Sequence, residues 1–89
     1  MSKEIWKFSV GITSKEQKII MPKAAAFLTV QMQQGLAQIW AVVDTEAERE
    51  EKTIRVYATG EPLSEEDRQY IGTVQIWDTV WHVFEINKH

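Results

Sequence analysis

The run from Thr79 to Ile86 is the densest stretch of β-branched and aromatic residues in the chain. Such side chains suit a pleated, packed surface, and the run lacks Gly and Pro, so it predicts a strand. Successive side chains point to opposite faces of a strand. One face carries Val80, His82, Phe84 and Ile86, and the other carries Thr79, Trp81, Val83 and Glu85. Because neither face is plainly polar, we expect this strand inside a sheet and covered on both sides over most of its length.

Six further segments have the patterning of short strands, with turn-forming residues between them. They span residues 4–10, 16–21, 24–34, 36–43, 53–59 and 70–77. Gly11 and the Thr13–Ser14 pair separate the first two segments, and this short loop predicts a hairpin between them. Pro22 cannot donate a hydrogen bond to a neighbouring strand, so it marks the end of the second segment.

The segment 24–34 fits two descriptions. Its Ala and Gln residues favour a helix by intrinsic propensity. Its apolar residues Leu28, Val30 and Met32 alternate with polar ones, which favours a strand. We take the strand, with Gly35 in the turn that leads to a hairpin partner at 36–43.

Two acidic segments separate later strands. The first, Asp44–Glu51, holds five acids and one Arg, and we interpret it as a solvated hairpin tip or a frayed helical turn. The second begins at Ser64, where an acid three residues after a capping residue resembles a helix start with room for one helical or 3₁₀ turn. The sequence thus predicts a single all-β domain over residues 1–89, a small antiparallel sandwich or partly closed barrel of about seven short strands.

Size and composition point to contacts beyond one subunit. A chain of 89 residues buries only roughly 60–65% of the surface that its unfolded form exposes. The chain nevertheless carries four Trp, three Phe and two Tyr, and each ring has about 150–250 Å² of surface that prefers to leave water. We therefore expect a ligand site, a homo-oligomer, or both. Of Trp40, Trp77 and Trp81, most should lie in the core and one should be exposed.

Other bulk features exclude whole classes of protein. With no cysteine, the chain has no disulfides or thiolate chemistry, which fits a cytoplasmic protein. No apolar run approaches the roughly 20 residues that span a bilayer, and the start of the chain lacks the apolar core of a signal peptide. A net charge of −3 argues against binding duplex nucleic acid through its phosphates.

Catalysis has little basis in the sequence. His89 is terminal and expected to fray, which leaves His82 on a mostly apolar strand face. We interpret His82 as a core residue that donates to a carbonyl in preference to a general base. With no Cys and one usable His, a zinc site is not expected, and no cofactor motif is present. The acids lie in solvated loops, where their pKa values suit no acid–base chemistry. We therefore predict that the chain is not an enzyme.

One strand carries groups that suit a nucleotide. Arg55, Tyr57 and Thr59 project from the same face of the 53–59 segment and lead into Gly60. A guanidinium is a bidentate donor for phosphate, a Tyr ring can stack on a base, and a Gly lets a backbone N–H approach an anion. The same residues also fit an exposed strand face with ordinary cross-strand pairing.

Six segments of the chain form a distinctive set: Ile5–Phe8, Met21–Lys23, Ile39–Asp44, Thr59–Pro62, Tyr70–Thr73 and the closing Val80–Glu85. In these segments the chain resembles a widespread family of small phage-encoded proteins. Relatives have a Gly-Thr-Gly-x-Pro stretch, whereas this chain has Ala58 in the first of those positions. The replacement of that glycine reduces access to the backbone there.

The resemblance extends by analogy to phage anti-CBASS sponges, which sequester the cyclic-oligonucleotide signals of bacterial antiphage defence. It implies an oligomeric protein that binds a cyclic di- or trinucleotide without hydrolysing it, in the cytoplasm of the infected cell. The implied ligand-binding residues are Arg55, Tyr57, Thr59, Gly60, Trp81 and His82, and Lys7 or Lys23 could assist. An alternative is an acidic interaction protein that inhibits or scaffolds a host or phage protein. A structural role in the virion also stays open.

Overall fold

All seven predicted segments form strands in the computed structural model, which describes residues 2–87. The strands are β1 (Lys3–Val10), β2 (Gln17–Pro22), β3 (Ala26–Gln33), β4 (Leu36–Asp44), β5 (Arg49–Ala58), β6 (Arg68–Ile76) and β7 (Thr79–Ile86). Every strand pair is antiparallel, and residues 2–87 contain no helix, so the all-β prediction is confirmed. The loop around Ser64 forms a bend in place of the expected helical turn.

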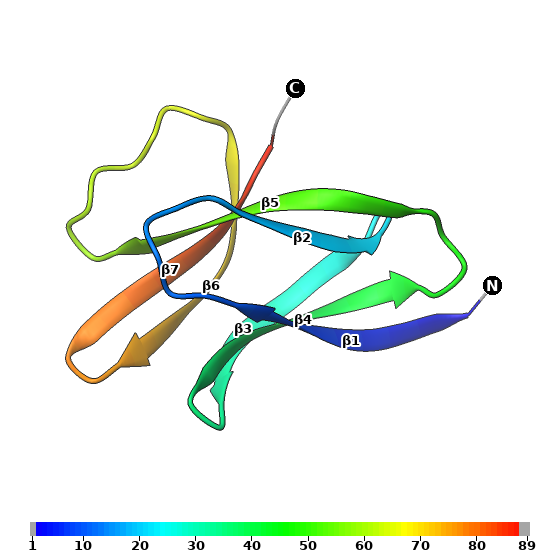
Figure 1. Ribbon diagram of the computed structural model, residues 1–89, viewed down its shortest axis with the longest axis horizontal. Coiled ribbons are helices and arrows are strands. Elements are labelled where there is room, and N and C mark those ends of the chain that lie inside the picture. The colour runs from blue at the N-terminus through cyan, green and yellow to red at the C-terminus, as the bar shows by residue number, and fades with distance from the viewer. Residues whose placement is uncertain (1, 88–89) are drawn as a thin grey trace.

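The strands form two sheets that make a small sandwich (Figure 1). The three-stranded sheet has the order β1-β4-β3, and the four-stranded sheet has the order β2-β5-β7-β6. The sheets do not join into a closed barrel, so of the two predicted architectures, sandwich and partly closed barrel, the structure shows the sandwich. On one side, the edge strands β3 and β6 pack on each other: an added Cβ on Gly72 would lie only 2.7 Å from Cγ1 of Val30.

The predicted hairpin between the first two strands is wrong. β1 pairs with β4, and β2 pairs with β5 in the other sheet. The loop between them crosses the sandwich, and Gln17 braces it through 2.8 and 2.7 Å hydrogen bonds to the amide and carbonyl of Gly11. The acidic stretch after Asp44 also joins the two sheets, so it is not a hairpin tip. The predicted hairpin of β3 and β4 is confirmed.

The core lies between the inward faces of the two sheets. The strand alternation places β-branched residues there, and four of them are completely buried: Ile39, Ile54, Val56 and Val83. The Cα extents of the molecule are 42 × 33 × 16 Å. Two sheets about 10 Å apart fill the short dimension, and residues 2–87 form no third layer of strands or helices.

β7 lies between β5 and β6 and forms hydrogen bonds to both, so the prediction of an internal strand is confirmed. Its inward face is buried at Val83. Its outward face is less covered than expected, because His82 and Phe84 are only half-buried. This outward face forms part of the site described next.

Candidate functional site

An apolar pocket of about 230 Å³ lies on the outer face of the four-stranded sheet, where β5 ends. Its lining consists of Tyr57, Ala58, Thr59, Gly60, Glu61, Leu63, His82 and Phe84. Tyr57 and His82 are direct neighbours across β5 and β7, which explains how two distant segments of the chain meet here. The pocket therefore brings together four of the six predicted site residues.

A tight turn closes β5 beside the pocket. The amide of Glu61 donates to the carbonyl of Ala58 at 3.0 Å, and Gly60 has a φ of 92°. A positive φ at the third position of a four-residue turn is typical of a type II turn, and glycine adopts it without a steric penalty. We predicted from the sequence that Gly60 helps to bind an anion. The structure shows that Gly60 also supplies the positive φ that this turn requires.

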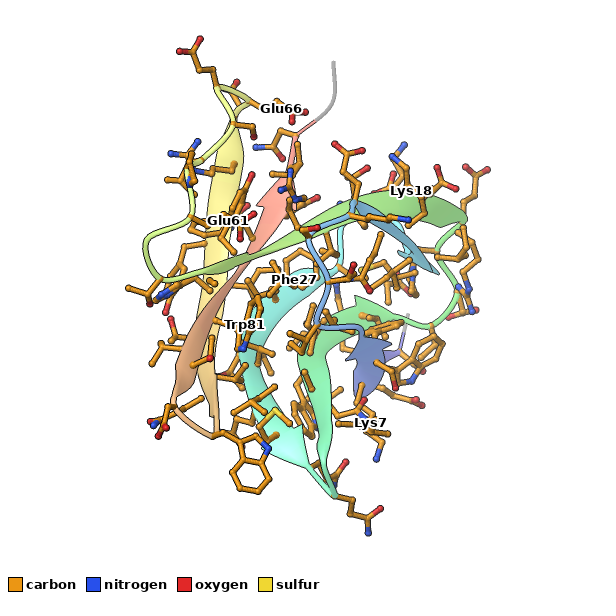
Figure 2. The ribbon with its side chains drawn as sticks, turned by 60° about the vertical axis from the view of Figure 1, so that its left-hand side comes forward. Lys7, Lys18, Phe27, Glu61, Glu66 and Trp81 are labelled. Carbon is orange, nitrogen blue, oxygen red and sulfur yellow. The ribbon has the colours of Figure 1, made fainter. Side chains whose placement is uncertain are left out.

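Arg55 lies next to the pocket with its guanidinium over the ring of Tyr57, 4.5 Å from the ring centre. Its Nη2 is 3.5 Å from Oε2 of Glu61, while Oε1 of the same carboxylate accepts a 3.0 Å hydrogen bond from the amide of Ala58. Figure 2 shows Glu61 pointing back toward β5 from the loop that follows it. The Nε of Arg55 is buried and has no hydrogen-bond partner within residues 2–87. The guanidinium is therefore only partly satisfied.

The ring of Tyr57 is not the open stacking surface that the strand pattern predicts, because only 2% of the residue is exposed. The loop after β5 folds over it, and its hydroxyl lies 3.0 Å from the hydroxyl of Ser64. The edge of the neighbouring Phe84 meets this ring at an interplanar angle of 75°. Phe84 is less buried and lines the pocket, so it offers the more accessible ring.

His82 is held by hydroxyl groups on both sides of its ring. Its Nε2 lies 2.7 Å from Oγ1 of Thr59, and its Nδ1 lies 3.1 Å from Oγ1 of Thr73. Oγ1 of Thr59 also lies 3.3 Å from the carbonyl oxygen of Val80, and Oγ1 of Thr73 contacts the hydroxyl of Tyr70. Each hydroxyl can donate or accept, so the tautomer of His82 sets the direction of both hydrogen bonds. The partners of His82 are hydroxyl groups, so the interpretation of a core histidine that donates to a carbonyl is wrong.

The geometry separates Trp81 from the other predicted site residues. Adjacent residues of a strand point to opposite faces, and Trp81 packs against the buried core while His82 faces outward. Figure 2 shows Trp81 on the inner side of β7, in the space between the sheets. Lys7 lies on β1, in the other sheet, where it donates to Gln33 at 2.7 Å.

Four pocket residues were not predicted as site residues: Ala58, Glu61, Leu63 and Phe84. Phe84 has a sequence signal, because it lies two residues after His82 and so shares its strand face. Glu61 and Leu63 lie in an irregular loop, where no periodicity indicates which way a side chain points.

A second cavity, of about 380 Å³, is polar and centres on Lys52. The ammonium lies 3.0 Å from a carboxylate oxygen of Glu50 and 3.4 Å from one of Glu85. The hydrogen bond from Lys52 holds the pKa of Glu50 below its usual value, against the effect of burial. Burial lowers the pKa of Lys52, but the hydrogen bond to Glu50 and the two carboxylate charges outweigh it and raise that pKa. These groups satisfy one another and leave no free cation for a ligand.

Within residues 2–87, no three His, Cys, Asp or Glu side chains come together as metal ligands, and no helix is long and apolar enough to cross a membrane. His89 lies outside the described residues. No curated protein and no solved structure matches the chain. A family model described as a domain of unknown function, DUF7352, matches residues 1–89, and the chain therefore belongs to the DUF7352 family.

Proposed function

We propose that this chain is a phage anti-defence protein that binds a cyclic di- or trinucleotide immune signal and sequesters it without hydrolysis. The observation that carries the proposal is the state of Arg55. Its guanidinium has one long contact to Glu61 and a buried Nε that has no partner among residues 2–87, directly beside an apolar pocket. A phosphate oxygen could supply the missing acceptor at the edge of a site that also accommodates a base.

The pocket suits one base in preference to a whole ligand. Small-molecule sites usually measure about 300–1,000 Å³, and this pocket is smaller, at about 230 Å³. In the proposed complex, a base packs on Phe84 and Leu63, and its polar edge meets the hydroxyl of Thr59 or the imidazole of His82. The remainder of the cyclic ligand lies outside the pocket, where it contacts Arg55 and the Thr59–Gly60 turn.

Glu61 is the main obstacle to an anionic ligand. Its carboxylate occupies the side of Arg55 that a phosphate would approach, and like charges repel. Binding therefore requires Glu61 to turn away, so that Arg55 exchanges one anionic partner for another. The overall charge of −3 also means that attraction to phosphate is local to Arg55 and does not come from the whole surface.

A thermal-shift panel of cyclic di- and trinucleotides tests the proposal. At a ligand concentration about 100-fold above Kd, the Tm of a domain of this size should rise by roughly 10 °C or more. Arg55→Gln and Arg55→Glu should abolish the shift while the variants stay folded in the absence of ligand. Glu48→Lys is the matched control, because Glu48 is exposed in the loop between β4 and β5 and should bind ligand like the unmodified chain.

Absence of any shift in the unmodified chain, far above micromolar ligand, would overturn the proposal. If the chain instead binds a partner protein through its acidic residues, the pattern should be the opposite. Glu48→Lys would then weaken binding of the partner, and Arg55→Glu would leave that binding unchanged. The two acidic loops, 45–48 and 59–67, lie at opposite ends of the long axis of the molecule (Figure 1). They therefore do not form the continuous acidic face that a nucleic-acid mimic needs.

A further inference from the structure

Trp77 lies at the tip of the hairpin of β6 and β7, in a two-residue loop with Asp78. The residue is 91% exposed, so its indole packs against almost nothing in its own chain. Its φ is 54°, in the left-handed region, and its carbonyl accepts a 3.1 Å hydrogen bond from the side chain of Gln75.

Both properties are unfavourable for an isolated subunit. A bulky side chain with a positive φ is strained, and hairpin loops of this length favour Gly, Asn or Asp at such positions. An indole exposed to water also forgoes the burial of a large apolar surface. The hairpin needs the positive φ but not the indole, because glycine would adopt this φ without strain. We therefore expect the contact that uses the indole outside the subunit.

The same chain offers a receptor for an indole. The pocket at the end of β5 is apolar and, at about 230 Å³, has room for a single ring system. Leu63 and Phe84 provide apolar contact, and the Glu61 carboxylate at the rim is an acceptor for an indole N–H. Trp77 is not part of the lining of its own pocket, so the ring must come from another molecule.

We infer that Trp77 of one copy docks in the pocket formed by residues 57–61, 63, 82 and 84 of a second copy. Charge favours this partner. Asp78 is the single charge in the hairpin loop, and Glu61, the single acid of the pocket, is paired with Arg55. Two acidic chains can therefore meet here with little repulsion. Because the ring and the pocket lie at different places on one subunit, the contact is either reciprocal in a two-fold dimer or repeated head to tail.

This inference goes beyond the proposed ligand, since the docking needs no nucleotide. A docked indole and a bound base would occupy the same space and exclude each other. The experiment below uses the chain alone, so its outcome is independent of whether any cyclic nucleotide binds.

Sedimentation velocity of the full chain, up to about 200 μM, tests the inference. The unmodified chain should self-associate, and Trp77→Gly and Leu63→Glu should each weaken association by at least about tenfold. Leu63 is exposed, so a charge there should not disrupt the fold. Trp77→Gly should also raise the Tm, because glycine relieves the strained φ, and this separates lost docking from unfolding.

A mixture of the two variants gives the sharpest result. Trp77→Gly keeps an intact pocket and Leu63→Glu keeps an intact indole, so the mixture should form heterodimers that neither variant forms alone. The inference is overturned if the unmodified chain stays monomeric across the range, if both single variants associate as it does, or if the mixture stays monomeric.

Discussion

Gly72 of β6 lies against Val30 of β3 so closely that the two edge strands leave no room for a side chain between them. A Cβ on Gly72 would lie 2.7 Å from Cγ1 of Val30 and 3.2 Å from its backbone nitrogen. The absence of a side chain at residue 72 thus lets the two sheets meet along this side of the sandwich.

We expect Gly72→Ala to destabilise the fold by about 1–3 kcal/mol, because the added methyl overpacks a contact that includes backbone. Urea unfolding measures the loss. Val30→Ala also costs stability by leaving a cavity, but in the double variant the two losses should be less than additive. Strict additivity would mean that the Val30 side chain does not cause the strain.

The hydrogen bonds around His82 predict its tautomer. We expect Oγ1 of Thr59 to donate to the carbonyl of Val80, which makes Nε2 of neutral His82 the donor to Thr59 and Nδ1 the acceptor from Thr73. Long-range ¹H–¹⁵N correlation spectra should show a protonated Nε2 at neutral pH. Thr73→Val should weaken this preference, because it removes the donor to Nδ1. A dominant Nδ1–H form in the unmodified chain would contradict the assignment.

Glu61 has two separable roles, and two substitutions distinguish them. Glu61→Gln retains a carbonyl oxygen for the amide of Ala58 and loses only the ion pair with Arg55, so it should cost less than about 1 kcal/mol. Glu61→Ala leaves the amide and the guanidinium without an acceptor, and should cost about 1–3 kcal/mol. Equal losses in urea unfolding would show that the ion pair dominates.

The cluster around Lys52 predicts how stability depends on pH. The pKa of Glu50 is lowered from 4.5 by the hydrogen bond from Lys52, so the folded state binds fewer protons there than the unfolded state. Its stabilisation is therefore present above pH 4.5 and is lost as the pH falls through the lowered pKa. Glu50→Gln should destabilise the chain at neutral pH, and the difference should shrink as the pH falls below 4.5 and vanish once Glu50 is protonated in the folded state.

Lys52 gives the complementary behaviour at high pH. Its pKa is raised above 10.5, so its contribution is complete below that pH and is lost as the pH rises through the raised value. Unfolding curves of Lys52→Met and the unmodified chain should therefore converge at strongly alkaline pH. A constant difference across the alkaline range would assign the effect of Lys52 to packing of its aliphatic stem.

The strands were predictable because alternation is a local signal. Leu28, Val30 and Met32 alternate with polar residues, and this pattern correctly outweighed the helix propensity of the alanines before them. Sheet membership was not predictable in the same way. A loop such as Gly11–Glu16 is long enough for a hairpin and also long enough to cross between two sheets, and nothing in its residues distinguishes the two paths.

The candidate site was predictable only where strand geometry fixes it. Arg55, Tyr57 and Thr59 share the outward face of β5 as expected, because alternate residues point the same way. The burial of Tyr57 depends on an irregular loop that folds over its ring, which no periodic pattern encodes. Trp81 could have been excluded from sequence, since it is adjacent to His82 and must therefore face the opposite side.

The internal position of β7 has a consequence for how the chain is made. This strand is synthesised after the other six, yet it must enter the four-stranded sheet between β5 and β6. Until it arrives, β5 lacks one of its two neighbours and β6 has none in that sheet, so a nascent chain that stops before Thr79 cannot complete the sandwich. The fold should thus be acquired only after β7 has been synthesised, and a fragment that ends before Thr79 should stay unfolded.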